Sequence, residues 1–387
     1  MEDDLEPPTG LRAQVQGRVL LLTICAAGIG GTFQFGYNLS IINAPTLHIQ
    51  DFTNATWQAR TGKPLPDHGV LLVWSLIVSL FSLGGLCGAL LAGPLAVMLG
   101  RGAGGRGGQQ PWPLSSLCLA LRRLRGSGDV VAELQELAAE RAACRGQRAR
   151  RPWELFRDPG LRRQVASLVV LGSAMELCGN DSVYAYASSV FRQAGVPEDR
   201  VQYAIVGTGS CELLAAVVSC VVIERVGRRV LLTGGYCLMA CWGGIFTVAL
   251  CLQTSCPWAP YLAMSCIFAF ILSFGIGPAG VTGILATELF DQTARPAAYV
   301  VCGALLWSTL FLVGLGFPFV MEGLSCFLYV PFVLICVCGA TYTAFFLPET
   351  KGKTFLQISE ELDRLNFPGR THGPGWRDPE VIQSTEL

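Results

Sequence analysis

Long apolar stretches alternate with short polar connections along most of the chain, and one polar segment of roughly 60 residues interrupts them. A membrane-spanning helix needs about 20 mostly apolar residues. Stretches of that length occur at roughly 18–40, 70–99, 164–190, 201–223, 230–253, 260–287, 299–321 and 325–346. The pattern therefore predicts an all-α protein that crosses a lipid bilayer several times.

The composition agrees with a membrane protein. Of the 387 residues, 51% are hydrophobic and 14% are charged, whereas soluble domains carry about 25% charged residues. Lysine plus arginine and aspartate plus glutamate balance at 28 each, so no bulk charge favours a nucleic-acid partner. The N-terminal residues are acidic, and we therefore interpret the first apolar stretch as a retained helix rather than a cleaved signal.

Basic residues gather in alternate connections, namely 101–163, 224–229, 291–296 and 349–353. Cytoplasmic loops carry the excess of Lys and Arg, so we expect these connections and both termini to lie in the cytoplasm. The expected division is an N-terminal tail at 1–17, two transmembrane helices within 18–101 with an extracellular loop at 41–69, a cytosolic junction at 102–163, a six-helix transmembrane half at 164–346 and a C-terminal tail at 347–387. Asn54 begins an Asn-Ala-Thr sequon in that loop, and we expect it to carry a glycan.

The junction contains one segment with helical spacing, in which Val130, Leu134 and Leu137 recur on one face and Asp129 can cap the start. We interpret it as a solvated surface helix. The alternative is a cytosolic brace that packs beneath the membrane bundle.

Three acidic residues, Glu176, Asp181 and Glu212, lie well inside apolar stretches. A carboxyl group at the centre of a span costs about 2.5–3.5 kcal/mol on insertion scales, so such groups usually face a cavity or a partner. We expect a polar wall whose carboxylates accept hydrogen bonds from a polyhydroxylated ligand. A cation would suit the same groups, and a carboxyl group hydrogen-bonded within the bundle is the structural alternative.

The stretch 275–283 is dense in glycine and contains Pro278, which removes a backbone donor. Discontinuous helices at membrane depth line cavities and form transporter binding sites. We therefore expect Gly277, Pro278 and Gly280 to form a helix break beside a cavity.

Enzyme and metal chemistry find little support in the sequence. Most of the 16 cysteines lie in apolar stretches, where cysteine behaves as a small hydrophobic residue. Gly352-Lys353-Thr354 lacks the glycine that a phosphate-binding loop needs five positions earlier, since Leu347 stands there. We expect no metal, no cofactor and no catalytic residue.

Four longer motifs carry a resemblance to a known family: GTFQFGYNLSIINAP at 31–45, ERVGRR at 224–229, TELFDQTARPAA at 287–298 and PETKGKTF at 348–355. The chain resembles the facilitative hexose transporters, the sugar-porter family of the major facilitator superfamily, and within it the fructose-associated class. The resemblance covers about 17–101 and 118–366. It implies a fold of two six-helix halves that rock about a central sugar site.

In this comparison the first two helices and the last six match, whereas the third to sixth are absent. The truncated N-terminal half thus has two helices and the C-terminal half is complete. The glycine- and arginine-rich tract at 102–108 falls at this junction and resembles the scar of a deletion or of alternative splicing.

The resemblance also implies site residues. Met175, Glu176 and Asp181 stand at the positions of the paired glutamines and the asparagine of the family's seventh helix, and Glu212 stands at the eighth-helix asparagine. The implied sugar-facing wall is therefore more acidic than in the glucose pattern.

On the tenth helix, Gly275 and Gly283 replace a glutamate and a tryptophan, which widens the implied site. Tyr186 is expected to help close its outer mouth. Asn38 stands where proton-coupled relatives have an aspartate, which favours passive transport.

The expected function is facilitative transport of glucose or fructose by alternating access in the plasma membrane, with the sugar and the lipid bilayer as partners. A second hypothesis is a transport-inactive shortened form that acts by forming homo- or hetero-oligomers with related transporters. A third is an organic-cation carrier that uses the acidic cluster.

Overall fold

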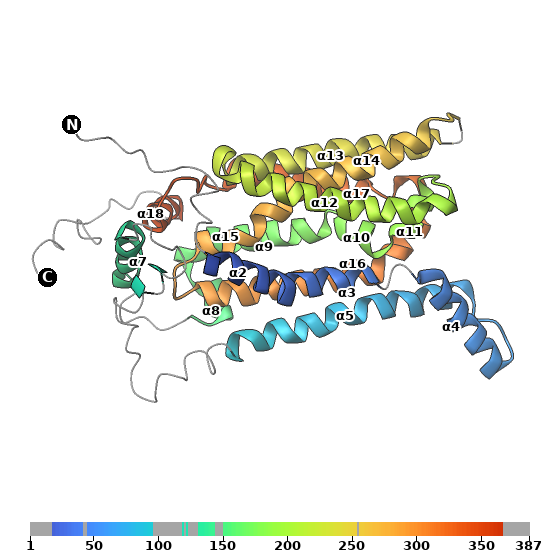
Figure 1. Cartoon of the computed structure of the whole chain (residues 1–387), viewed down its shortest axis with the longest axis horizontal. Coiled ribbons are helices and arrows are strands. Elements are labelled where there is room, and N and C mark those ends of the chain that lie inside the picture. Colours follow the sequence, from blue (N-terminus) through green and yellow to red (C-terminus); the bar gives the residue numbers. More distant parts are fainter. Residues whose placement is uncertain are drawn as a thin grey trace, which may run out of the picture.

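The computed structural model describes residues 18–41, 45–95, 118–119, 121–122, 131–143, 150–253 and 255–366. Within these ranges the secondary structure is helical, without strands, and the long helices run side by side in a bundle (Figure 1). The N-terminal tail, the glycine- and arginine-rich tract and residues 367–387 lie outside the described residues. The prediction of an all-α membrane protein is confirmed.

Two long apolar segments form the N-terminal part. The first consists of α2 (Arg18–Ala27), the π-helical turn η1 (Gly28–Thr32) and α3 (Phe33–Ile41), and the second is α5 (Asp67–Leu95). Between them the predicted extracellular loop folds as α4 (Thr46–Thr61), which ends where Gly62 adopts a φ of 74° and donates its N–H to the Gln58 carbonyl. Figure 1 shows α4 at the end of the bundle opposite α7 and α18.

The second part of the chain supplies the remaining transmembrane segments. Its elements are α8 (Pro152–Arg157), η3 (Pro159–Leu161), α9 (Arg162–Leu177), α10 (Asn180–Ala185), α11 (Ala187–Gln193), α12 (Glu198–Val226), α13 (Arg228–Leu252), α14 (Ala259–Phe274), η4 (Gly275–Ala279), α15 (Gly280–Leu289), α16 (Arg295–Leu324), η5 (Ser325–Phe327), α17 (Val330–Phe346) and α18 (Phe355–Asn366).

Among the described residues, 6 helices are long and apolar enough to cross a membrane. They cover Val19–Asn38, Asp67–Gly93, Glu198–Val226, Arg228–Leu252, Ala259–Leu289 and Arg295–Leu324, and Val330–Phe346 is a shorter apolar helix. The predicted span at 164–190 does not form one helix, because the chain turns at Cys178–Gly179 and again at Tyr186.

Close approaches at glycine join α5 to α16. A Cβ added to Gly85 would lie 2.2 Å from the Trp307 ring, and one added to Gly93 would lie 2.5 Å from Cγ2 of Val300. On the other helix, a Cβ at Gly314 would meet the Ser79 hydroxyl at 3.1 Å. Small residues let helices in lipid pack closely, and here they fix the second N-terminal helix against the C-terminal half.

The helix α7 (Val131–Ala143) is held to the bundle by Glu140, whose side chain is buried. Glu140 accepts hydrogen bonds from Arg295, the first residue of α16, at 3.0 Å and from Gln292, in the turn before α16, at 2.9 Å. The preferred interpretation of this segment as a solvated surface helix is therefore wrong. A buried carboxylate needs a cationic or donor partner, and Arg295 supplies it, so α7 acts as the brace.

Candidate functional site

The main irregularity of the C-terminal half is the break between α9 and α10. Gly179 there has a φ of 96°, which favours glycine. A Cβ at this position would also lie 2.6 Å from the Phe332 ring on α17. The glycine thus allows the chain to turn within the apolar bundle, and it sets α10 at a new angle to α9.

This break brings the three predicted acidic residues together. Glu176 lies in the last turn of α9 and is 4% exposed, Asp181 lies in the first turn of α10, and Glu212 lies in α12. The Glu176 and Asp181 side chains are hydrogen-bonded to each other, and Glu212 lies within electrostatic range of Asp181. A hydrogen bond between two carboxyl groups requires that one of them carries the proton.

Residues of α10 add polar groups beside the carboxyls. The Tyr184 hydroxyl lies within electrostatic range of Glu212 and Asp181. The Asn180 Oδ1 and Ser182 Oγ atoms are buried and have no hydrogen-bond partner among the described residues. A buried polar atom without a partner costs about 1–3 kcal/mol, so these atoms can gain from bound water or a hydroxylated ligand.

The three other predicted substrate positions differ in their surroundings. Met175 is half-buried and packs against an apolar cluster of the bundle. A Cβ at Gly275 would lie 2.6 Å from the Ala215 side chain, so this glycine serves a helix contact with α12. Gly283 is exposed and has no atom within 4 Å of an added Cβ, which leaves space at this position.

The predicted helix break at Gly277, Pro278 and Gly280 takes the form of the π-helical turn η4, so the chain stays helical from α14 into α15. The turn lies against α13, where a Cβ at Gly235 would be 2.7 Å from the Pro278 ring. The Ser219 hydroxyl of α12 donates a hydrogen bond to the Ile276 carbonyl at 3.0 Å. Neighbouring helices therefore satisfy and support the irregular turn, as an irregular backbone in a membrane requires.

The predicted gate residue Tyr186 lies between the two parts of the molecule. Its ring is 5% exposed and stacks on Phe317 of α16, with ring centroids 5.2 Å apart. Its hydroxyl donates to the Gly314 carbonyl and also contacts the Ser75 side chain on α5. Tyr186 is thus positioned to respond to any displacement between α5 and α16, and its role as a gate stays a prediction.

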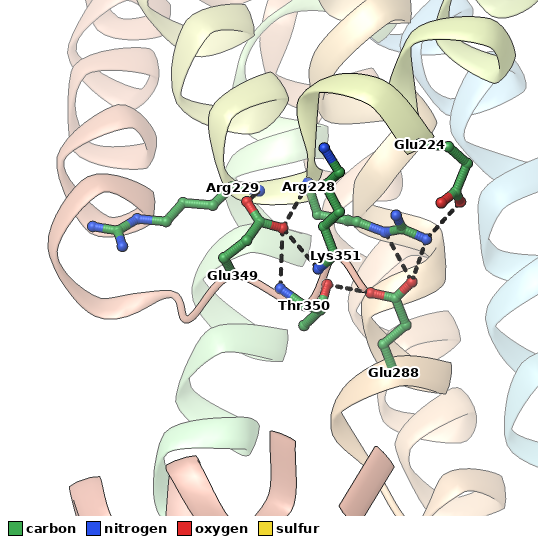
Figure 2. A network of polar contacts seen from close by, with 7 residues as sticks. All are labelled: Glu224, Arg228, Arg229, Glu288, Glu349, Thr350 and Lys351. Atoms are coloured by element: carbon green, nitrogen blue, oxygen red, sulfur yellow. Dashed lines mark hydrogen bonds and ion pairs between the residues drawn. The ribbon is translucent and has the colours of Figure 1, made fainter. Parts of the chain in front are cut away.

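A second polar assembly lies at the arginine-rich end of the helices (Figure 2). Arg228 forms ion pairs with Glu224 at 2.9 Å and with Glu288 at 3.0 Å. The other Glu288 oxygen accepts a hydrogen bond from the Thr350 hydroxyl at 2.5 Å. The network joins α12, α13, α15 and the segment after α17, and its members belong to three of the four motifs found in the sequence.

Glu349 completes this network by capping α13. Its carboxylate accepts hydrogen bonds from the backbone N–H groups of Arg228 at 3.0 Å and Arg229 at 3.1 Å, and also from those of Thr350 and Lys351. An anion at a helix N-terminus is favoured by the unpaired N–H groups and by the helix dipole. A Cβ at Gly227 would lie 2.8 Å from this carboxylate, which explains the glycine in the ERVGRR motif.

Asn54 lies within α4 and not in an irregular loop. It is half-buried, and its Oδ1 atom accepts a hydrogen bond from the Leu65 N–H at 3.0 Å. Its glycosylation stays a prediction.

The transmembrane helices, the carboxyl cluster at a helix break and the network at the basic end define an integral multi-pass membrane protein with a buried polar site, a typical transporter arrangement. A family model described as "Sugar (and other) transporter" matches residues 22–104 and 119–362. The chain belongs to this sugar transporter family, which comprises transporters and not enzymes. The match is interrupted between residues 104 and 119, a gap that begins within the glycine- and arginine-rich tract.

Curated relatives agree with the family. The chain is 62% identical to the human protein "Solute carrier family 2, facilitated glucose transporter member 11", covering 97% of this chain and 99% of the relative. It is 32% identical to facilitated glucose transporter member 9 of Mus musculus, covering 90% of this chain and 86% of the relative. The alignment with the human protein extends over 493 residues, which is 106 more than the 387 residues of this chain.

Solved structures show the same fold. The chain matches a double-tryptophan variant of XylE with a TM-score of 0.55 and 23% identity, covering 66% of this chain and 52% of that chain. It matches XylE, the proton:xylose symporter of the major facilitator superfamily bound to 6-bromo-6-deoxy-D-glucose, with a TM-score of 0.51 and 22% identity, covering 62% and 50%. The chain thus spans about half the length of these structures, and its fold is like that of the major facilitator superfamily.

Sequence reasoning missed the break at Gly179 and the polar contribution of Asn180 and Tyr184. The signal was present in the consecutive Gly-Asn-Asp of an otherwise apolar stretch, since Gly and Asn favour turns. Counting apolar residues over 164–190 concealed it.

Proposed function

We propose that this chain has the site of a facilitative carrier, which moves glucose or fructose down a gradient by alternating access. Sugar hydroxyls would donate hydrogen bonds to Glu176, Asp181 and Glu212. The resemblance to the family adds three residues to the same wall, Met175, Gly275 and Gly283. Gly275 already packs against Ala215 of α12. The observation that carries the proposal is the meeting of three carboxyl groups at a helix break, in a chain of the sugar transporter family.

The proposal includes an orientation in the plasma membrane, with both termini and the segments 102–163 and 347–387 in the cytoplasm. It is supported by the cluster of Arg228, Arg229 and Lys351 at one end of the bundle (Figure 2), since basic residues favour the cytoplasmic side. Asn54 on α4 would then face the outside. Peptide-N-glycosidase treatment tests the position of Asn54. A decrease in mass would show a glycan on α4 and would support the orientation, whereas an unchanged mass would give it no support.

Uptake of labelled glucose and fructose into transporter-null cells tests the sugar proposal. The triple variant Glu176→Ala, Asp181→Ala, Glu212→Ala is expected to lose uptake by about tenfold or more, because a hydrogen bond to a charged group contributes about 1.5–3 kcal/mol. Glu322→Ala is the matched control, since this glutamate is exposed at the end of α16. Equal uptake by the triple variant at equal surface expression would refute the site. Passive transport predicts uptake that a protonophore leaves unchanged.

A specific observation favours a second function, in which the chain is transport-inactive and acts by associating with related transporters. The human relative is aligned over 493 residues, and the first apolar helix of this chain has 0% of its membrane window buried. With a shortened N-terminal half, the carboxyl groups of the C-terminal half would face no second wall across the transport pathway. Reconstitution of the purified chain separates the two hypotheses: saturable sugar uptake by the monomer excludes the second, and competition by organic cations rather than sugars would favour a cation carrier.

A further inference from the structure

Two cysteines from separate elements meet at the end of the bundle opposite the basic network. Cys251 is exposed near the end of α13, and Cys326 is half-buried in η5, between α16 and α17. The two thiols lie close enough to interact electrostatically, and η5 packs against α13. We propose that Cys251 and Cys326 form a disulfide that ties the outer end of α13 to the turn between α16 and α17.

The packing around the two thiols fixes their relative position. Phe246 of α13 lies five residues before Cys251, and its ring meets that of Tyr329, three residues after Cys326, with centroids 4.7 Å apart. Tyr329 is 2% exposed and Leu328 is fully buried, so the segment after Cys326 is anchored. Two cysteines can be bridged only where the backbone already holds their side chains close together, and the contact between Phe246 and Tyr329 holds the end of α13 beside η5.

The redox environment of this end follows from the orientation proposed above. Helix α13 begins at Arg228, within the basic network, and its 25 residues extend about 37 Å, enough to cross the bilayer. Cys251 and Cys326 therefore reach the side opposite the cytoplasm, which is the oxidising side during membrane insertion and afterwards.

The chemistry is thiol–disulfide exchange with a disulfide-bearing oxidant of the secretory compartment. The thiolate of one cysteine attacks the oxidant's disulfide and expels one oxidant thiolate, which gives a mixed disulfide. The second cysteine thiolate then attacks the sulfur of the first and expels the other oxidant thiolate. Two protein thiols are oxidised to one disulfide, two electrons pass to the oxidant, and the two protons end on its thiols.

Differential alkylation of the full chain from cell membranes tests the bridge. Free thiols are blocked with iodoacetamide in denaturant, the protein is then reduced, and newly exposed thiols are labelled with N-ethylmaleimide before mass spectrometry. We expect the second label on Cys251 and Cys326 and the first label on Cys256, which lies in the same outer connection. A peptide pair linked through Cys251 and Cys326 should appear without reduction.

Two variants sharpen the result. Cys251→Ser should free Cys326 for the first label, whereas Cys256→Ser should leave the pair oxidised. The proposal is overturned if Cys251 and Cys326 carry the first label in the unmodified chain, or if Cys326 stays oxidised in Cys251→Ser because another cysteine pairs with it. Sugar uptake is not the readout, so this test is independent of the proposed transport function.

Discussion

Gly234 and Gly235 are neighbours on α13 with opposite surroundings, and replacing each by alanine measures how tightly the π-helical turn is held. A Cβ at Gly235 would lie 2.7 Å from Cδ of Pro278, 2.9 Å from Cα of Gly277 and 3.2 Å from the Ser273 carbonyl. A Cβ at Gly234 would have no atom within 4 Å. Gly235→Ala must therefore push η4 away from α13, whereas Gly234→Ala is accommodated.

The magnitude follows from these contacts. Carbon atoms in contact are about 3.5–4.0 Å apart, so Gly235→Ala requires a displacement of about 1 Å against a proline ring and backbone, neither of which can rotate away. Overpacking of this kind costs about 1–3 kcal/mol, and the better helix propensity of alanine returns at most about 1 kcal/mol. Gly234→Ala keeps that gain without the clash. We expect the two variants to differ by about 1–3 kcal/mol in the free energy of unfolding.

The assay is the thermal midpoint of detergent-solubilised protein. It is measured as the temperature at which half of the protein is no longer monodisperse after heating. Gly235→Ala should have a lower midpoint than the unmodified chain, and Gly234→Ala an equal or higher one. If Gly235→Ala is as stable as Gly234→Ala, then α13 and η4 are not in the tight contact that the structure shows. If η4 moves during the transport cycle, Gly235→Ala should also reduce sugar uptake in the cell assay.

Three further changes test other contacts. Glu349→Gln should lower the thermal midpoint, because the loss of the carboxylate charge at the start of α13 costs about 1–2 kcal/mol, and Glu360→Gln on the exposed face of α18 is its control. Glu140→Ala should increase proteolysis of α7, because it leaves Arg295 without the carboxylate that it contacts at 3.0 Å; an unchanged cleavage rate would contradict the brace. Burial favours a higher pKa for Asp158, but the hydrogen bonds from Arg150 and the Gly160 N–H outweigh it and hold the pKa below its usual value. Since the folded-state pKa is the lower one, the contribution of Asp158 to stability is complete above about pH 4 and is lost as the pH falls through the folded pKa; Asp158→Asn should flatten this part of the stability–pH curve.

Most of the architecture could be predicted because it depends on a single local quantity, the length of each apolar stretch. The exception is 164–190, where the apolar count is sufficient but the chain is interrupted by the positive φ of Gly179. That interruption determines which side chains meet at the candidate site. In a continuous helix, residues advance by about 100° each, so Glu176 and Asp181 would point about 140° apart and could not share a hydrogen bond.

Contacts between distant segments could not be predicted in this way. Glu140 and Arg295 are 155 positions apart in the sequence, and nothing in the spacing of Val130, Leu134 and Leu137 identifies Arg295 as a partner. For Gly275 the glycine was interpreted as space for a ligand, whereas it lies against Ala215. A glycine in an apolar stretch is compatible with either a cavity or a close helix contact, and only the neighbouring helix decides between them.

The arrangement of the N-terminal helices bears directly on how this chain could transport a sugar. Helix α5 is fixed to α16 by the Gly85–Trp307 and Gly93–Val300 contacts, and Phe35 of α3 touches the Trp307 ring at a centroid distance of 5.5 Å. A rigid-body rocking movement would have to displace these contacts together, and packed glycine contacts do not deform continuously. The parts of the pathway that can move within one chain are therefore α10, which turns at Gly179, and the π-helical turn η4. Transport by the isolated chain would consist of local gating at these two irregular positions, whereas rocking of two halves would require an N-terminal half from another molecule.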